Sequence, residues 1–183
     1  MKLMMTLFIF TLSLFSLDIQ NKPIIFDEKR VELSKEYIKK HYNLTVNNIK
    51  ITPRIIVVHH TGIDDLEKSF QKFFNVSLSQ DRADIAGAGN LNVSTHFMID
   101  TDGIIYRLMD ETTMARHVIG LNYSSIGIEN VGGENLKDNL TAKQLQSNIK
   151  LINYLKNKYN TINYVIAHYE YQNFENSVLW LEV

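Results

Sequence analysis

Residues 54–61 read RIIVVHHT, and this short stretch decides the fold class. The uninterrupted aliphatic run at 55–58 is typical of a strand that is buried on both faces of a sheet. Side chains alternate across a strand, so His59 and His60 are expected to face opposite sides if the strand continues. We therefore expect at most one of the two histidines to reach a shared metal ion.

The segments around this strand alternate between helical and extended patterns. Helices are expected over residues 28–42, 64–75 and 141–159, and strands over 95–99, 104–108, 125–129 and 164–167. Thr141 and Gln144 have the spacing of a capping box, which marks the start of a helix. The dipeptide Asp102-Gly103 readily forms the turn of a hairpin. Together these patterns predict an α/β fold, with a single mixed β-sheet flanked by helices.

The composition indicates one domain and excludes several classes of protein. The chain has 183 residues, of which 45% are hydrophobic and 10% aromatic, which is enough for one buried core. Its 19 basic and 20 acidic residues nearly balance, which argues against a nucleic-acid partner. It has no cysteine, so disulfides and thiolate metal sites are excluded. Any metal ion must therefore be held by histidines and carboxylates.

The first residues have the pattern of a secretory signal. Lys2 is followed by an apolar run that ends at Leu17, after which the chain turns polar. A membrane-spanning helix needs about 20 apolar residues, and this run is shorter. We therefore expect residues 1–17 to be a signal peptide and the protein to be exported to the periplasm or the extracellular space. Residues 18–53 are expected to form a helical extension, and 54–183 the main domain.

Polar residues follow several of the expected strands directly. His59 and His168 each come after an apolar strand, and Glu129 ends another. Open α/β sheets bind ligands at the carboxyl ends of their strands, although each residue alone is also typical of an ordinary strand end. Gly127 lies on the same strand face as Glu129 and is expected to leave open space beside the carboxylate. His41, in a charged helix, is expected on the surface.

Five short segments occur in an order that resembles a known family. They are residues 56–61 (IVVHHT), 93–103 (VSTHFMIDTDG), 115–117 (ARH), 125–129 (SIGIE) and 165–168 (VIAH). This series is similar to that of the zinc-dependent N-acetylmuramoyl-L-alanine amidases, the family that includes the peptidoglycan recognition proteins. Arg116 stands where that family commonly has Trp.

The resemblance implies an amidase-like or peptidoglycan-recognition-like domain and a reaction. The reaction is zinc-dependent hydrolysis of the amide between the lactyl group of N-acetylmuramic acid and L-alanine. By position, His59 and His168 would hold the zinc, and Glu129 would be the catalytic acid and base. His96 and His117 would line the cleft and bind substrate, or else have a structural hydrogen-bonding role. The implied partners are peptidoglycan and muropeptides; no nucleic acid or protein partner is indicated.

The end of the chain departs from the family pattern. The family usually has a third zinc ligand, Asp or Cys, shortly after the second histidine, but residues 169–183 contain neither. The acids in that segment are Glu170, Glu175 and Glu182. The domain is expected to be truncated before its third ligand, to use one of these glutamates, or to bind peptidoglycan without cutting it. The alternative to an exported zinc amidase is thus a noncatalytic peptidoglycan-binding module of the same fold.

Overall fold

The computed structural model describes residues 17–80 and 82–183. The expected signal peptide at 1–17 therefore lies outside the described residues, except for Leu17. Within the described ranges, no helix is long and apolar enough to cross a membrane.

The centre of the fold is a six-stranded sheet with the order β1-β4-β3-β5-β2-β6. Its strands are β1 (Ile19–Asn21), β2 (Ile55–His60), β3 (Phe97–Ile99), β4 (Ile105–Arg107), β5 (Ser125–Asn130) and β6 (Tyr164–Ala167). The hairpin partners β3 and β4 are antiparallel, whereas the other neighbouring strands are parallel. The predicted single mixed sheet is confirmed.

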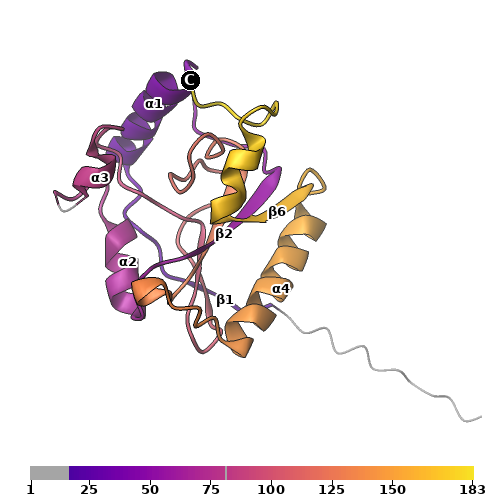
Figure 1. The fold of residues 1–183 in the computed structure, drawn as a ribbon. Helices are drawn as coiled ribbons and strands as arrows, with labels where there is room; N and C mark the ends of the chain where they lie inside the picture. Colours follow the sequence, from indigo (N-terminus) through magenta and orange to yellow (C-terminus); the bar gives the residue numbers. More distant parts are fainter. Residues whose placement is uncertain (1–16, 81) are drawn as a thin grey trace, which may run out of the picture.

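Helices cover both faces of this sheet (Figure 1). The helices are α1 (Glu28–Tyr42), α2 (Leu66–Phe74), α3 (Ala83–Ala86) and α4 (Ala142–Lys158), with 3-10 turns η1 (Glu134–Leu136) and η2 (His168–Phe174). Helix α4 lies on one side of the sheet, and α1, α2 and α3 lie on the other (Figure 1). The predicted capping box is present, since Thr141 and Gln144 each accept a hydrogen bond from the other's backbone N–H.

The central strands divide their side chains between two different environments. Toward α4, Ile56, Ile126 and Ile128 pack in one buried cluster with Leu151 and Leu155 of that helix. On the opposite face, the alternate side chains of β2 pack with the segment around residues 118–121. Because side chains alternate, His59 of β2 and Glu129 of β5 also lie on this second face.

Residues 18–53 are part of the same fold rather than a separate unit. Strand β1 pairs with β4, and α1 contributes Tyr37 and Ile38 to a buried cluster that also contains Met114. Arg30 on α1 is only 1% exposed, and its guanidinium donates to backbone carbonyls at the end of α2. Strand β1 was not expected, since its three residues, IQN, carry no periodic pattern.

Candidate active site

Three of the residues singled out in the sequence lie together at the ends of neighbouring strands. His59 and Glu129 are direct partners in the β2–β5 register, and their side chains share a face of the sheet. Nδ1 of His59 lies 4.0 Å from Oε1 of Glu129. His168, the first residue of η2 after β6, brings its ring centroid to 4.6 Å from that of His59.

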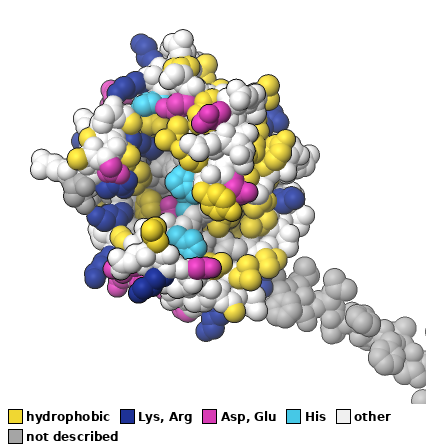
Figure 2. Space-filling view, in the orientation of Figure 1, with side chains coloured by type: hydrophobic (Ala, Val, Ile, Leu, Met, Phe, Trp, Pro, Cys, Tyr) yellow, Lys and Arg dark blue, Asp and Glu magenta, His cyan; other side chains and the backbone are white. Residues whose placement is uncertain are grey.

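A cavity of about 260 Å³ opens at this point. Its walls are formed by His59, His60, Thr61, Ile63, Ser69, Lys72, Phe73, Arg82, Val93, Arg116, His117, Glu129 and His168. A second cavity, of about 390 Å³, shares His117 and His168 with the first and extends toward α1 and the C-terminal segment. Figure 2 shows histidine side chains in and around a hollow on this face of the molecule. Because His117 lines both cavities, together they could hold an elongated ligand that extends to both sides of this residue.

Glu129 is prepared to hold a proton at neutral pH. The side chain is 7% exposed, and its Oε2 is buried with no hydrogen-bond partner. Burial raises the pKa of this carboxyl to about 8 from an ordinary value of 4.5. A carboxyl with a raised pKa and a free oxygen in a cavity has the properties of a general acid or base.

The two histidines are held in the neutral form, which is the form that binds a metal. Burial, together with the nearby His168, lowers the pKa of His59 to about 3. The exposed ring of His168 stands at the rim, and partial desolvation lowers its pKa as well. Both imidazoles thus suit a zinc ion, whose usual ligands include histidine nitrogens. However, no group of three His, Cys, Asp or Glu in residues 17–80 and 82–183 has the geometry to hold a metal.

None of the three C-terminal glutamates supplies the missing ligand in this structure. Glu170 accepts a hydrogen bond from the backbone N–H of Ala167 at 2.8 Å, and Glu175 is exposed at the end of η2. Glu182 accepts from the backbone N–H of Gly120 at 3.2 Å. The part of the chain that is described therefore offers the ion two imidazoles, and the alternative in which a C-terminal glutamate is the third ligand is not seen.

Glu182 instead joins the C-terminal segment to α1 through His41. Nδ1 of His41 lies 2.7 Å from Oε1 of Glu182, and its Nε2 donates to the carbonyl of Ala88 at 2.8 Å. The ring also stacks on Tyr37, with centroids 4.2 Å apart. The expectation of a free surface position for His41 was therefore wrong, because contacts far apart in the sequence enclose it.

His96 lies beneath the site, where both of its ring nitrogens are bonded to the backbone. Nε2 donates to the carbonyl of Thr113 at 2.8 Å, and Nδ1 accepts from the N–H of Gly127 at 3.0 Å. The side chain is 0% exposed and does not border the cavity. This geometry fits the structural alternative for His96 better than contact with a substrate.

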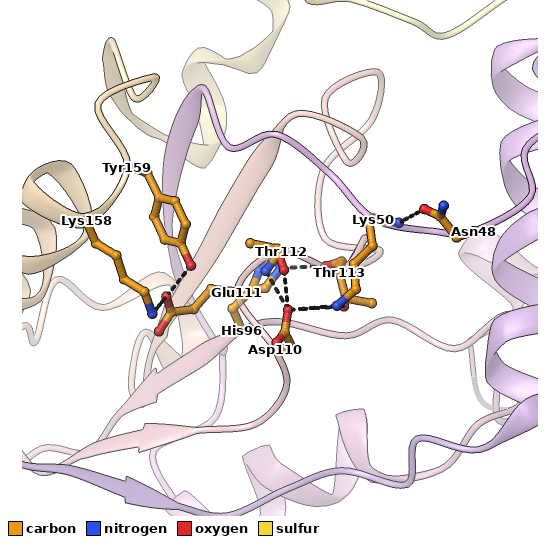
Figure 3. Close-up of polar contacts among 9 residues, drawn as sticks. All are labelled: Asn48, Lys50, His96, Asp110, Glu111, Thr112, Thr113, Lys158 and Tyr159. Atoms are coloured by element: carbon orange, nitrogen blue, oxygen red, sulfur yellow. Dashed lines mark hydrogen bonds and ion pairs between the residues drawn. The ribbon is translucent and has the colours of Figure 1, made fainter.

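The loop that carries Thr113 is fastened at two points (Figure 3). On one side, Lys50 pairs with Asp110 at 3.2 Å. On the other, the buried carboxylate of Glu111 accepts hydrogen bonds from Lys158 and Tyr159 near the end of α4. These contacts hold the loop in place, and with it the carbonyl of Thr113 that accepts from His96.

His117 borders the cavity and contacts His59 directly. Its Nδ1 lies 3.0 Å from Nε2 of His59, and its Nε2 lies 3.1 Å from Oγ of Ser125. The expectation that Gly127 leaves open space was wrong, since a Cβ there would come within 2.9 Å of the His117 ring. Ser125 was not predicted as a site residue, although it shares the alternating pattern of Gly127 and Glu129 on β5.

Arg116 shapes the wall between the two cavities. It is 5% exposed, and its guanidinium donates to the backbone carbonyls of Ile85, Gly89 and Leu91. It also lies over the ring of Tyr37, at 5.2 Å from the centroid. The residue that replaces the common Trp therefore orders the loop that follows α3.

Comparisons with known proteins agree with this fold. The model of a family described as N-acetylmuramoyl-L-alanine amidase matches residues 49–177. The amidase LysC from Clostridium intestinale URNW is 26% identical, with a TM-score of 0.54 over 86% of this chain and 87% of that one. An AmpD derivative is 22% identical, with a TM-score of 0.55 over 82% and 80%. PGRP-SA of Apis mellifera is 22% identical, with a TM-score of 0.50 over 75% and 92%. No curated protein sequence matches significantly.

Proposed function

The chain belongs to the N-acetylmuramoyl-L-alanine amidase family, and on that premise we propose that it cleaves the amide between N-acetylmuramic acid and L-alanine in peptidoglycan. The observation that carries the proposal is the carboxyl of Glu129. It is buried, has an unpartnered oxygen, and lies beside the neutral imidazole of His59 in an open cavity. The apolar start of the chain, residues 1–17, supports export to the periplasm or the extracellular space, where this substrate occurs.

We propose zinc as the cofactor, with His59 and His168 as its protein ligands. When bound, the ion would polarise the scissile carbonyl, activate a water molecule and favour the ionised form of the adjacent Glu129. Ligand number sets both the affinity and the geometry of a zinc site. Because the described residues supply only two imidazoles, we expect this chain to bind zinc weakly.

Glu129 performs the proton transfers in the proposed reaction. Its free Oε2 takes a proton from the attacking water as the carbon–oxygen bond forms, and then gives a proton to the L-alanine nitrogen as the carbon–nitrogen bond breaks. The products are a free lactyl carboxylate and a peptide with a new amino terminus. The second cavity, beyond His117, gives the rest of the substrate space on one side of the scissile bond.

The proposal is tested by incubating the full chain and zinc with a purified muropeptide and identifying the products by mass spectrometry. We expect a peptide that begins with L-alanine, and we expect Glu129→Gln to slow its release by about 10²–10⁴-fold. Cleavage between sugars or within the peptide would contradict the proposal. So would an equal rate for Glu129→Gln.

A second candidate is a noncatalytic peptidoglycan-binding module, which the lack of a third metal ligand among the described residues favours. In that case the muropeptide binds but is not cut at any zinc concentration. Isothermal titration with the same muropeptide, beside the product analysis, separates the two functions. Binding without cleavage would replace the amidase proposal with this one.

A further inference from the structure

Strand β5 directs three alternate residues toward the site, and the proposed reaction uses only one of them. Ser125, Gly127 and Glu129 occupy one face of the strand, opposite the isoleucines that pack on α4. Ser125 is 0% exposed and therefore does not contact a ligand in the cavity. Its hydroxyl instead bonds to His117, which in turn contacts His59.

The direction of these hydrogen bonds follows from the donors that are available. Oγ of Ser125 lies 2.8 Å from the carbonyl of Leu121, and a carbonyl only accepts, so the hydroxyl proton belongs to that contact. Oγ must then accept from His117 at 3.1 Å, which places the proton of His117 on Nε2. Nδ1 of His117 is consequently an acceptor, and His59 donates to it from Nε2 at 3.0 Å.

We propose that Ser125 and His117 are positioning residues that hold the proton of His59 on Nε2. The lone pair of His59 is thereby kept on Nδ1, the nitrogen that lies 4.0 Å from Glu129. A histidine ligand needs this arrangement, because the bond made by one ring nitrogen fixes which nitrogen is free for the metal. The inference rests on the proposed function for its purpose, since it gives Nδ1 of His59 to the zinc ion.

The packing around His117 supports this role. A Cβ at position 127 would lie 2.9 Å from Cγ and Nδ1 of the His117 ring, so glycine is what lets the ring pack closely against this face of β5. The three contacts along this chain, from His59 to His117, from His117 to Ser125 and from Ser125 to the carbonyl of Leu121, are all between 2.8 and 3.1 Å. Neutral rings each have one donor and one acceptor, as the chain of hydrogen bonds requires.

The test uses the metal-free full chain labelled with ¹⁵N in histidine. Two-bond ¹H–¹⁵N correlation spectra show which ring nitrogen carries the proton. We expect His59 to be protonated on Nε2 alone in the native chain. In Ser125→Ala, the Nε2–H of His117 loses its acceptor, and we expect a measurable fraction of His59 protonated on Nδ1. A native His59 protonated on Nδ1 would overturn the proposal.

Ser124 supplies a matched control. Its hydroxyl also bonds to the carbonyl of Leu121, at 3.3 Å, and is not bonded to His117. Ser124→Ala should therefore leave the His59 proton in place, whereas Ser125→Ala should move it. If the ¹H–¹⁵N spectra of the two variants are the same, whether both native or both altered, Ser125 has no specific effect on the His59 proton. That result would overturn the proposal.

Zinc titration gives a second readout, and His117 gives a second pair of variants. An asparagine at 117 can place an amide oxygen near the former Nδ1 and still accept from His59, whereas a leucine cannot. We expect His117→Leu to weaken zinc binding by about 10–100-fold, the usual effect of removing such a partner, and His117→Asn to lose less. Equal losses in His117→Asn and His117→Leu would contradict an orienting hydrogen bond.

These readouts are separate from the reaction. If the chain cuts no muropeptide but His59 behaves as described, the amidase proposal fails and the positioning role stands. If the chain is an active amidase and Ser125→Ala leaves the His59 proton on Nε2, the positioning role alone fails.

Discussion

The two faces of the central strands follow the same backbone but differ in chemistry. Toward α4, β2 and β5 present aliphatic side chains, and Ile56, Ile126 and Ile128 are all 0% exposed. On the other face, the same strands end in His59 and Glu129, which are nearly as well buried, at 5% and 7%. The face toward α4 buries mainly apolar side chains. The opposite face also buries two ionisable side chains, His59 and Glu129.

This difference indicates where stability and chemistry are located. Burial of apolar surface stabilises the fold by roughly 25 cal/mol per Å². Burial of an ionisable group is unfavourable unless the group stays neutral or finds partners. Burial shifts the pKa of His59 downward and that of Glu129 upward, in both cases toward the neutral form. We therefore expect substitution of the isoleucines that face α4 to change mainly stability, and substitution of His59 or Glu129 to change mainly activity.

The largest effect is expected for Glu129→Gln. This variant keeps the size of the side chain but removes the group that transfers protons, so the hydrolysis rate should fall by about 10²–10⁴-fold. The midpoint of thermal unfolding at acidic pH, where the native carboxyl is also neutral, should hardly change. The measurement pairs muropeptide hydrolysis with thermal unfolding, and a variant of near-native rate would show that another group moves the proton.

Ile126→Ala should have the opposite profile. Ile126 is next to Gly127 in sequence but faces α4, and removing a buried isoleucine side chain costs about 2–5 kcal/mol of stability. The rate per folded molecule should stay near the native value. Urea denaturation and the hydrolysis assay on the same sample check both parts. A rate loss as large as that of Glu129→Gln would mean that the two faces are not independent.

The pH dependence of stability should separate Glu129 from the rest of the fold. Its folded pKa of about 8 lies above the ordinary value of 4.5. Its contribution to the free energy of unfolding is therefore fully present below pH 4.5 and is lost as the pH rises through 8. In Glu129→Gln this titration is absent. We therefore expect the metal-free variant to gain stability relative to the native chain across that window, by a few kcal/mol. Urea denaturation at several pH values checks this, and a constant difference would contradict the raised pKa.

The smallest effect is expected for Lys50→Ala, because Lys50 lies outside both faces of the central strands. Lys50 and Asp110 form an ion pair whose side chains are 59% and 61% exposed. Exposed pairs of this kind contribute about 0–1 kcal/mol, and added salt screens them further. Urea denaturation should show a loss within that range. A loss of several kcal/mol would show that this pair is needed to hold the Thr113 loop against His96.

The sequence was sufficient for the parts of the molecule that repeat a local pattern. The aliphatic run before His59 and the capping box at Thr141 gave the central strand and the longest helix. Alternation along β2 predicts that His59 and His60 face opposite sides, and the family resemblance selects His59 for the site. In the structure His59 lies beside Glu129.

The remaining features depend on contacts between distant segments. Strand β1 exists because β4 pairs with it, and the position of His41 depends on Glu182, 141 residues later. The space beside Gly127 is filled by the ring of His117, which comes from another loop. The pattern of strand β5 alone could not predict this contact. The positions of the C-terminal glutamates also depend on such contacts. Glu170 and Glu182 bond to Ala167 and to His41 and Gly120, and Glu175 is exposed.

The most direct test of the account compares two neighbouring histidines. His59 and His60 are adjacent in β2, but only His59 is buried beside Glu129, while His60 is exposed. Zinc titration of the purified chain should show binding that His59→Ala abolishes and that His60→Ala leaves largely intact. Equal loss in both variants, or loss in His60→Ala alone, would contradict the assignment of one face of the sheet to the metal and the reaction.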